Sequence, residues 1–264
     1  MSGEANVAWA EMLGRWAIPD EIVSAAPKTP YLFDPEVFTA AADEALARAE
    51  DTPSDGVARA ALGAGDSVLD VACGAGAGSL RLRPSRVTGV DSSTPLLAAF
   101  AERAERMGIP STVIEGRWPD IEADAPVADV VVCHHVFYNV ADLAAFAAAL
   151  TAHAGHRVVV ELTAGHPLAW MSPYWKALHR FDQPDGPTAQ DAVAVLEELG
   201  YRVHQESWQR TYQMIGERGD EALARIARRL CLRASRHEEL RRLLEQVPPP
   251  TAREVVTLWW PGSG

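Results

Sequence analysis

The sequence predicts a doubly wound α/β fold, in which a mostly parallel seven-stranded sheet lies between two layers of helices. Short runs rich in β-branched residues alternate along the chain with stretches of helical periodicity. Several of these runs consist of consecutive apolar residues, which is typical of strands that are buried on both faces of a parallel sheet. In such sheets, ligands bind at the carboxyl ends of the strands.

Five predicted strands form the parallel part of the sheet, and two more complete it near the end of the chain. The five lie at residues 67–72, 86–91, 111–116, 128–133 and 156–163. The two later strands lie near residues 201–210 and at 253–260. Helical stretches between the parallel strands supply the crossover connections that such strands require.

Three helices between the strands have recognisable stripes or ends. Residues 94–108 show helical periodicity that stops at Gly108. Thr188 is the expected N-cap of a helix that continues to Leu199 and stops at Gly200. A stripe at positions i, i+3, i+4 and i+7 predicts a helix after the fourth strand, and its members are Leu143, Phe146, Ala147 and Leu150.

Two parts of the chain are predicted to lie outside this core. Residues 1–52 form an N-terminal helical cap, separated by "DTPSDG" from the main domain at 53–264, and its apolar stripe is Trp9, Met12, Leu13 and Trp16. A helical insertion is expected at about 213–248, with the stripes Leu223, Ile226, Ala227, Leu230 and Leu240, Leu243, Leu244, Val247. The arginines between residues 225 and 242 form either a solvated helix face or a surface for an acidic substrate or partner.

Composition narrows the classes of function. The net charge of −12 argues against a nucleic-acid partner, because nonspecific affinity for nucleic acid comes largely from Lys and Arg. No apolar run has the length of a membrane span, and residues 1–30 lack the pattern of a secretory signal, so we expect a cytoplasmic protein. The three cysteines are too few and too scattered for a disulfide framework. Only two lysines occur among many Arg and Ala residues, which favours a GC-rich bacterial source.

The segment "DVACGAGAGS" (70–79) is a glycine-rich turn that follows the first predicted strand. A dinucleotide fingerprint requires a third small residue, Gly or Ala, at a position that is Ser79 here, and the Gly-Lys-Ser/Thr of a P-loop is absent. Asp70 ends a buried apolar strand, where a carboxylate needs hydrogen-bond donors. We expect these donors to come from a cationic ligand or from a ring of backbone N–H groups.

Three motifs in order resemble the class I S-adenosylmethionine-dependent methyltransferases, in their small-molecule, type 11-like branch. They are "VLDVACGAGAG", "VTGVDSS" and "ADVVVCHHVFYNVADLAAF", each at the end of a predicted strand. Two further stretches, "WAIPDEIVSAAPKTPYLF" and "ELTAGHPLAWMSPYW", resemble a group of bacterial methyltransferases. The resemblance implies a Rossmann-like methyltransferase fold, S-adenosylmethionine as the cofactor and S-adenosylhomocysteine as the product.

The resemblance also implies which residues bind the cofactor. Asp91 matches the acidic residue that takes both ribose hydroxyls, and main-chain groups of Cys133 and His134 are expected near the methionine part. Ala72 replaces the first glycine of the turn, and Arg117 stands where Asp commonly binds adenine, so that stacking on Trp118 or a bond to Asp120 is expected instead. The helix after the turn looks about two residues short. The complete predicted set is Asp70, Ala72, Cys73, Gly74, Gly76, Asp91, Ser92, Arg117, Trp118, Cys133 and His134.

Methyl transfer from a sulfonium is an in-line displacement, which depends mainly on positioning and is helped by a base when the acceptor is a hydroxyl or an acidic carbon. The candidates are His135, then His166, with Tyr138 beside them. Each has the alternative role of shaping the cofactor pocket without moving a proton. No metal-ligand spacing connects the Cys and His residues after the fourth and fifth strands, so no metal is expected.

A small molecule is the expected acceptor, because the motifs of adenine-amine and of metal-dependent catechol methyltransferases are absent. The aromatic segment 164–187 is either a wall for a partly apolar acceptor, with Trp170, Tyr174 and Trp175 in contact with it, or the packed core of a loop. Two other functions stay open at this point. One is a non-catalytic protein that binds S-adenosylmethionine, and the other is a nicotinamide-dependent oxidoreductase.

Overall fold

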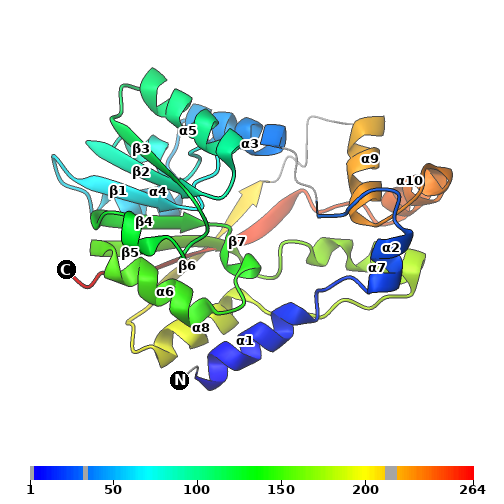
Figure 1. Ribbon diagram of the computed structural model, residues 1–264. Coiled ribbons are helices and arrows are strands. Elements are labelled where there is room, and N and C mark those ends of the chain that lie inside the picture. Colours follow the sequence, from blue (N-terminus) through cyan, green and yellow to red (C-terminus); the bar gives the residue numbers. More distant parts are fainter. Residues whose placement is uncertain (1–2, 32–34, 212–218) are drawn as a thin grey trace.

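A single seven-stranded sheet runs through the computed structural model, which describes residues 3–31, 35–211 and 219–264 (Figure 1). The strand order is β3-β2-β1-β4-β5-β7-β6, and β7 is antiparallel to both of its neighbours. The strands are β1 (Ser67–Val71), β2 (Arg86–Asp91), β3 (Ser111–Glu115), β4 (Ala128–His134), β5 (Ala154–Thr163), β6 (His204–Thr211) and β7 (Ala252–Pro261). The predicted fold class is confirmed, because the first five strands are all parallel.

Helices cover both faces of this sheet (Figure 1). On one face, α1, α6 and α8 pack together, and on the other α3, α4 and α5 do. The helices are α1 (Glu4–Gly14), α2 (Asp20–Ala25), α3 (Pro35–Ala47), α4 (Pro53–Arg59), α5 (Thr94–Arg106), α6 (Leu143–Ala152), α7 (Ser172–His179), α8 (Ala189–Glu198), α9 (Asp220–Arg229) and α10 (His237–Gln246). None of the helices in the described ranges is long and apolar enough to cross a bilayer.

Side-chain caps fix the starts of several helices. Thr188 caps α8 as predicted, and its N–H donates to the Asp191 carboxylate at 2.7 Å in a capping box. Thr52 caps α4 in the same way with Asp55. Residues 51–56, which we expected to be only a break, therefore contain the start of a helix.

The helix expected after the glycine-rich turn is absent, and a three-residue 3₁₀ turn, η1 (Leu80–Leu82), stands in its place. It ends at Arg83, whose φ of 52° is left-handed, directly before Pro84. A proline disfavours the helical conformation of the residue before it, which explains the stop. Helices α3 and α4 both pack against η1, and Arg81 of η1 donates to the Ala45 oxygen near the end of α3.

The three helices of the predicted N-terminal cap lie in three different places (Figure 1). Helix α1 packs on α6 and α8, and its Trp9 is fully buried with Nε1 donating to the Val140 oxygen at 2.8 Å. Residues Ile18 and Ile22, around α2, pack on a separate helical lobe. Helix α3 contacts α5 on the opposite face of the sheet.

This helical lobe consists of α7, α9 and α10 with the residues between α9 and α10, and it has its own apolar core. Tyr174 and Trp175 are 1% and 2% exposed within it. The predicted insertion supplies α9 and α10, whereas its first residues, 213–218, lie outside the described part of the chain. The buried members of the lobe core are Met171, Tyr174, Trp175, Leu178, Leu223, Ala227, Leu230, Cys231, Leu232 and Leu240.

Candidate active site

The glycine-rich turn leaves the carboxyl end of β1 with three left-handed residues: Ala72 (φ 57°), Gly74 (φ 51°) and Gly76 (φ 93°). A Cβ on Gly76 would lie 2.4 Å from Cδ1 of Leu80, so the turn closes tightly against η1 there. A Cβ on Gly74 would meet no atom within 4 Å. The turn is therefore closely packed on its inner side and leaves open space above Gly74.

Asp91, at the carboxyl end of β2, holds this turn. Its Oδ2 accepts a hydrogen bond from the Gly74 N–H, and its Oδ1 accepts one from the Ser93 N–H, both at 2.9 Å. A carboxylate has about four acceptor positions, so two remain for a ligand. Ser92, beside it, is exposed, and the Asp91 carboxylate is half-buried at the same edge.

The hydrogen-bond donor to Asp70 is a side chain, and not the cationic ligand or the ring of backbone N–H groups that we expected. The Ser79 hydroxyl donates to its Oδ2 at 2.5 Å, and the aspartate is 2% exposed. The expectation of a cationic ligand or a ring of N–H groups is thus replaced by one side chain from the same turn. Burial raises the pKa of Asp70 to about 7, although the Ser79 hydrogen bond opposes this shift and the charge of Asp91 adds to it.

Two adjacent histidines stand at the end of β4, and His134 is the last residue of the strand. His134 lies against the turn, because a Cβ on Gly78 would be 3.0 Å from His134 Nδ1. Its Nε2 is covered and has no hydrogen-bond partner within the described ranges, and burial lowers its pKa. Cys133 is fully buried, which raises the pKa of its thiol, so the thiol stays protonated at neutral pH.

His135 is bound to a carboxylate that the sequence analysis did not single out. Its Nε2 lies 2.9 Å from Oε1 of Glu161, the neighbouring residue on β5, and Arg210 Nη1 lies 3.2 Å from the same oxygen. Burial by itself would raise the pKa of Glu161. The His135 hydrogen bond and the charges of His134, His135 and Arg210 together outweigh burial, so the pKa lies below its ordinary value. Glu161 is the one carboxylate in the apolar run "RVVVELT", and that is the signal by which the sequence could have indicated it.

The other two predicted catalytic residues, His166 and Tyr138, form contacts that connect parts of the fold. The His166 ring stacks on Trp16 with centroids 3.7 Å apart, its Nδ1 accepts from the Leu168 N–H, and burial lowers its pKa to about 4. The Tyr138 hydroxyl donates to the Thr163 oxygen at 2.7 Å, and burial raises its pKa. Both side chains therefore link elements of the fold, and neither is a strong base in this arrangement.

The two residues predicted for the adenine loop differ in their surroundings. Arg117 is exposed after β3, whereas Trp118 is 6% exposed and packs edge-on against His153 with centroids 4.9 Å apart. The Trp118 Nε1 atom is covered and has no hydrogen-bond partner in the described part of the chain. This N–H is a donor at the sheet edge that a ligand could satisfy.

A comparison with protein families identifies the domain that carries these features. Residues 68–155, from β1 to the start of β5, match a family model described as "Methyltransferase domain". The chain contains a methyltransferase domain. The prediction of an enzyme of this kind is thereby confirmed, while no curated protein sequence matches the chain.

Several solved structures are similar in fold to most of this chain. The YcgJ protein from Bacillus subtilis has 14% identity and a TM-score of 0.55, over 80% of this chain and 98% of that chain. A protein described as a putative methyltransferase from Bacillus halodurans C-125 also has 14% identity and a TM-score of 0.55, over 79% and 96%. Magnesium protoporphyrin IX methyltransferase from Synechocystis PCC 6803, with bound SAH, has 15% identity and a TM-score of 0.52, over 98% and 100%.

A small hollow of about 150 Å³ lies within the helical lobe, between the 3₁₀ turn η4 (Ala169–Met171) and helix α9. Trp170 lines it, and the Arg253 guanidinium lies 5.8 Å from the Trp170 ring centroid. Its position beside Leu168 connects it to His166. The full lining is Leu168, Trp170, Met171, Ala222, Arg225, Ile226 and Arg229. Of the three predicted substrate residues, Trp170 therefore borders a hollow, while packing in the lobe accounts for the burial of Tyr174 and Trp175.

Only one group of potential metal ligands occurs in the described ranges, and it is remote from the glycine-rich turn. Asp66, Asp129 and His156 lie near the amino ends of β1, β4 and β5. Two hydrogen bonds from Ser67 already occupy the Asp129 carboxylate. The Cys and His residues after β4 and β5 do not form such a group.

The raised pKa of Asp70 should make the free energy of unfolding depend on pH. Between about pH 4 and pH 7 the folded protein holds a proton on this carboxyl that the unfolded chain has lost, because the folded-state pKa is raised. This contribution to stability is full below about pH 4 and is lost as the pH rises to about 7. Relative to wild type, Asp70→Asn should therefore gain on the order of 3 kcal/mol in free energy of unfolding across this interval. Urea unfolding of both proteins at several pH values measures this difference, and a difference independent of pH would contradict the raised pKa.

Proposed function

We propose that this chain transfers a methyl group from S-adenosylmethionine to a small-molecule acceptor and releases S-adenosylhomocysteine. The observation that carries the proposal is the left-handed turn tied to Asp91, with open space above Gly74, inside a methyltransferase domain. The similar Synechocystis protein, crystallised with bound SAH, supports the choice of cofactor. Binding of the cofactor without catalysis is the alternative that the experiments below separate.

The residues at the carboxyl edge fit such a nucleoside. Asp91 has two acceptor positions left for the ribose hydroxyls, and each charged hydrogen bond contributes roughly 1.5–3 kcal/mol. Trp118 Nε1 and His134 Nε2 are buried polar atoms without partners in the described ranges, and such atoms generally find a ligand or water. Ala72, Cys73, Gly74 and Gly76 supply the backbone of the turn, and Cys133 is the last residue but one of the neighbouring strand β4.

When bound, the cofactor supplies an activated methyl group on its sulfonium. The chain then has to hold the acceptor atom in line with that methyl group, and positioning contributes roughly 7–11 kcal/mol. His135 is the proposed base: Glu161 and Arg210 contact its Nε2 atom, and Nδ1, which bonds to no described residue, is the atom proposed to accept the proton. Its side chain is 43% exposed, so an acceptor can reach it.

The hollow beside Trp170 is the proposed site for the acceptor body. Its lining is mainly apolar, and Arg225 and Arg229 lie at its border. This combination fits an acceptor with an apolar part and an acidic group. Leu168 lines the hollow and also belongs to the loop that follows β5. Glu161, the partner of His135, lies near the end of the same strand.

Calorimetric titration with S-adenosylhomocysteine tests the cofactor, with NADH as the paired ligand. We expect one-to-one binding of the homocysteine compound alone and a loss of at least tenfold in affinity for Asp91→Ala, because the ribose acceptors disappear. Glu105→Ala, an exposed acidic residue on α5, is the matched control and should bind as wild type does. Unchanged affinity in Asp91→Ala would contradict the ribose assignment, and a response to NADH alone would contradict the cofactor.

His135→Ala tests the base. We expect S-adenosylhomocysteine affinity to be retained and the rate of methyl transfer to a screened acceptor to fall by about 10²–10⁴-fold. Glu161→Gln should lower the same rate by a smaller factor, because the neutral amide orients the His135 ring less firmly than the carboxylate does. A full rate in His135→Ala would exclude it as the base and leave His166 or no base at all.

A further inference from the structure

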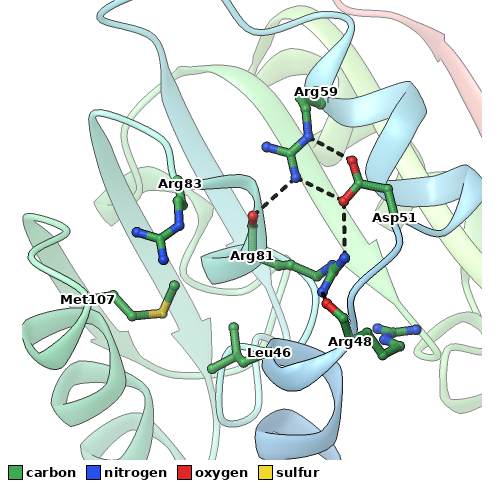
Figure 2. A pocket seen from close by; sticks show the side chains of 7 residues that line it. All are labelled: Leu46, Arg48, Asp51, Arg59, Arg81, Arg83 and Met107. Atoms are coloured by element: carbon green, nitrogen blue, oxygen red, sulfur yellow. Dashed lines mark hydrogen bonds and ion pairs between the residues drawn. The ribbon is translucent and has the colours of Figure 1, made fainter.

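The short connection η1 leaves a cavity on the α3–α4–α5 face of the sheet. It has a volume of about 320 Å³, and its lining is Leu46, Arg48, Asp51, Arg59, Arg81, Arg83 and Met107 (Figure 2). We call it the arginine cavity. None of its residues lies in the glycine-rich turn or lines the hollow beside Trp170, but the charges of Glu161 and Arg210, in the group around His135, act on Arg48. The arginine cavity is therefore a different set of residues that lies within electrostatic range of the proposed base.

Part of the arginine cavity is a fixed ion-pair network. Arg59 Nε lies 3.0 Å from one Asp51 oxygen and Arg81 Nη2 lies 3.1 Å from the other, as Figure 2 shows. Arg81 also pairs with Asp55 at 3.2 Å, and its side chain is only 9% exposed. These two arginines and two aspartates neutralise one another and hold the wall of the cavity in place.

The other two arginines give the arginine cavity its excess charge. The Arg83 side chain has no hydrogen bond or ion pair to any described residue, and Figure 2 shows its guanidinium beside Met107. Arg48 uses only its Nε, which donates to the Ala45 oxygen at 3.4 Å. Four guanidinium groups thus face two carboxylates, and two positive charges remain in a chain whose net charge is −12.

We propose that the arginine cavity binds a phosphate monoester. A dianion matches the excess of two positive charges, and the planar donors of Arg83 suit phosphate oxygens. Leu46 and Met107 provide an apolar border on which a short organic group can pack. The ligand is therefore a phosphorylated small molecule that binds apart from the methyl acceptor.

Thermal unfolding and calorimetric titration test the proposal, with inorganic phosphate and butyl phosphate as probes and sodium chloride at equal ionic strength as the reference. We expect both phosphates to raise the Tm above that in chloride, because a ligand bound only to the folded protein stabilises it. Butyl phosphate should bind at least threefold more tightly than inorganic phosphate if Leu46 and Met107 contact the organic group. Equal affinities would contradict the monoester and identify the free anion as the ligand.

Arg83→Gln should raise the Kd for both phosphates at least tenfold. Its unfolding in chloride should match that of wild type, because the Arg83 side chain has no hydrogen-bond or ion-pair partner among the described residues and the substitution keeps the backbone N–H that donates to Leu80. Arg106→Gln is the matched control on the neighbouring helix α5, where Arg106 forms an exposed pair with Glu102, and it should bind as wild type does. Equal stabilisation of wild type and Arg83→Gln by phosphate, or no stabilisation beyond chloride, would overturn the proposal. Affinity for S-adenosylhomocysteine, measured in parallel, distinguishes this result from a failure of the proposed cofactor site.

Discussion

Arg81→Met is expected to lower the free energy of unfolding by about 3–5 kcal/mol, because it leaves a buried carboxylate without its cation. Asp55, one of its partners, has a side chain that is 3% exposed. The same guanidinium also donates to three backbone oxygens that join the end of α3 to the start of α4. Its five acceptors are Asp55, Asp51, Ala45, Arg48 and Glu50. Met retains the apolar length of the side chain, so the change isolates these polar contacts.

The matched control for this variant is Arg106→Met. Arg106 forms an ion pair with Glu102 at 3.3 Å, but both side chains are more than half exposed, and such pairs contribute at most about 1 kcal/mol. Equilibrium urea unfolding at neutral pH provides the two free energies. Similar losses in the two variants would show that Arg81 is no more important than a surface arginine.

Gly76→Ala is the second change with a large expected effect, and it should destabilise the protein by about 2–5 kcal/mol. Two terms add in this variant. The backbone has a φ of 93°, which non-glycine residues rarely adopt, and the new Cβ would lie 2.4 Å from Leu80 and 3.2 Å from Phe100. Leu80 and Phe100 are fully buried, so neither can move away freely.

Gly74→Ala provides a contrast within the same turn. Its φ of 51° lies in the ordinary left-handed region and nothing lies within 4 Å of the added Cβ, so a loss of only about 1–2 kcal/mol is expected. The methyl group would enter the open space proposed for the cofactor, and S-adenosylhomocysteine affinity should fall at least tenfold. Urea unfolding and calorimetry on both variants check this pair. Equal stability, or unchanged affinity in Gly74→Ala, would contradict the geometry of the turn.

Local sequence patterns were sufficient for most of the sheet. The apolar runs at 67–72 and 128–133 form β1 and β4, because consecutive apolar residues are stable only where both faces are covered. The helix from Thr188 was also predicted correctly, since a capping box acts within four residues. The turn at Gly74 and Gly76 was located for the same reason: its conformation requires glycine irrespective of the rest of the chain.

Local patterns failed where a distant partner decides the outcome. The helix expected after the turn became η1, and Arg81 of η1 is held by residues that lie about 30 positions earlier. The donor to Asp70 was attributed to a ligand, although Ser79 supplies it across the turn. Glu161 was missed because a lone carboxylate in an apolar run indicates a special position but does not identify His135 as its partner.

The sequence by itself therefore determined the strands, the glycine-rich turn with Asp91 at the end of the next strand, and the methyltransferase class that these motifs indicate. Only the tertiary structure decided which side chains meet. The order of the strands brings His134 into register with Glu161 and so places His135 and Arg210 around one carboxylate. Folding also stacks Trp16 on His166, 150 residues away, and assembles the arginine cavity from residues in or next to α3, α4, η1 and α5. Such contacts depend on the packing of whole elements, which periodicity and residue type at one position do not encode.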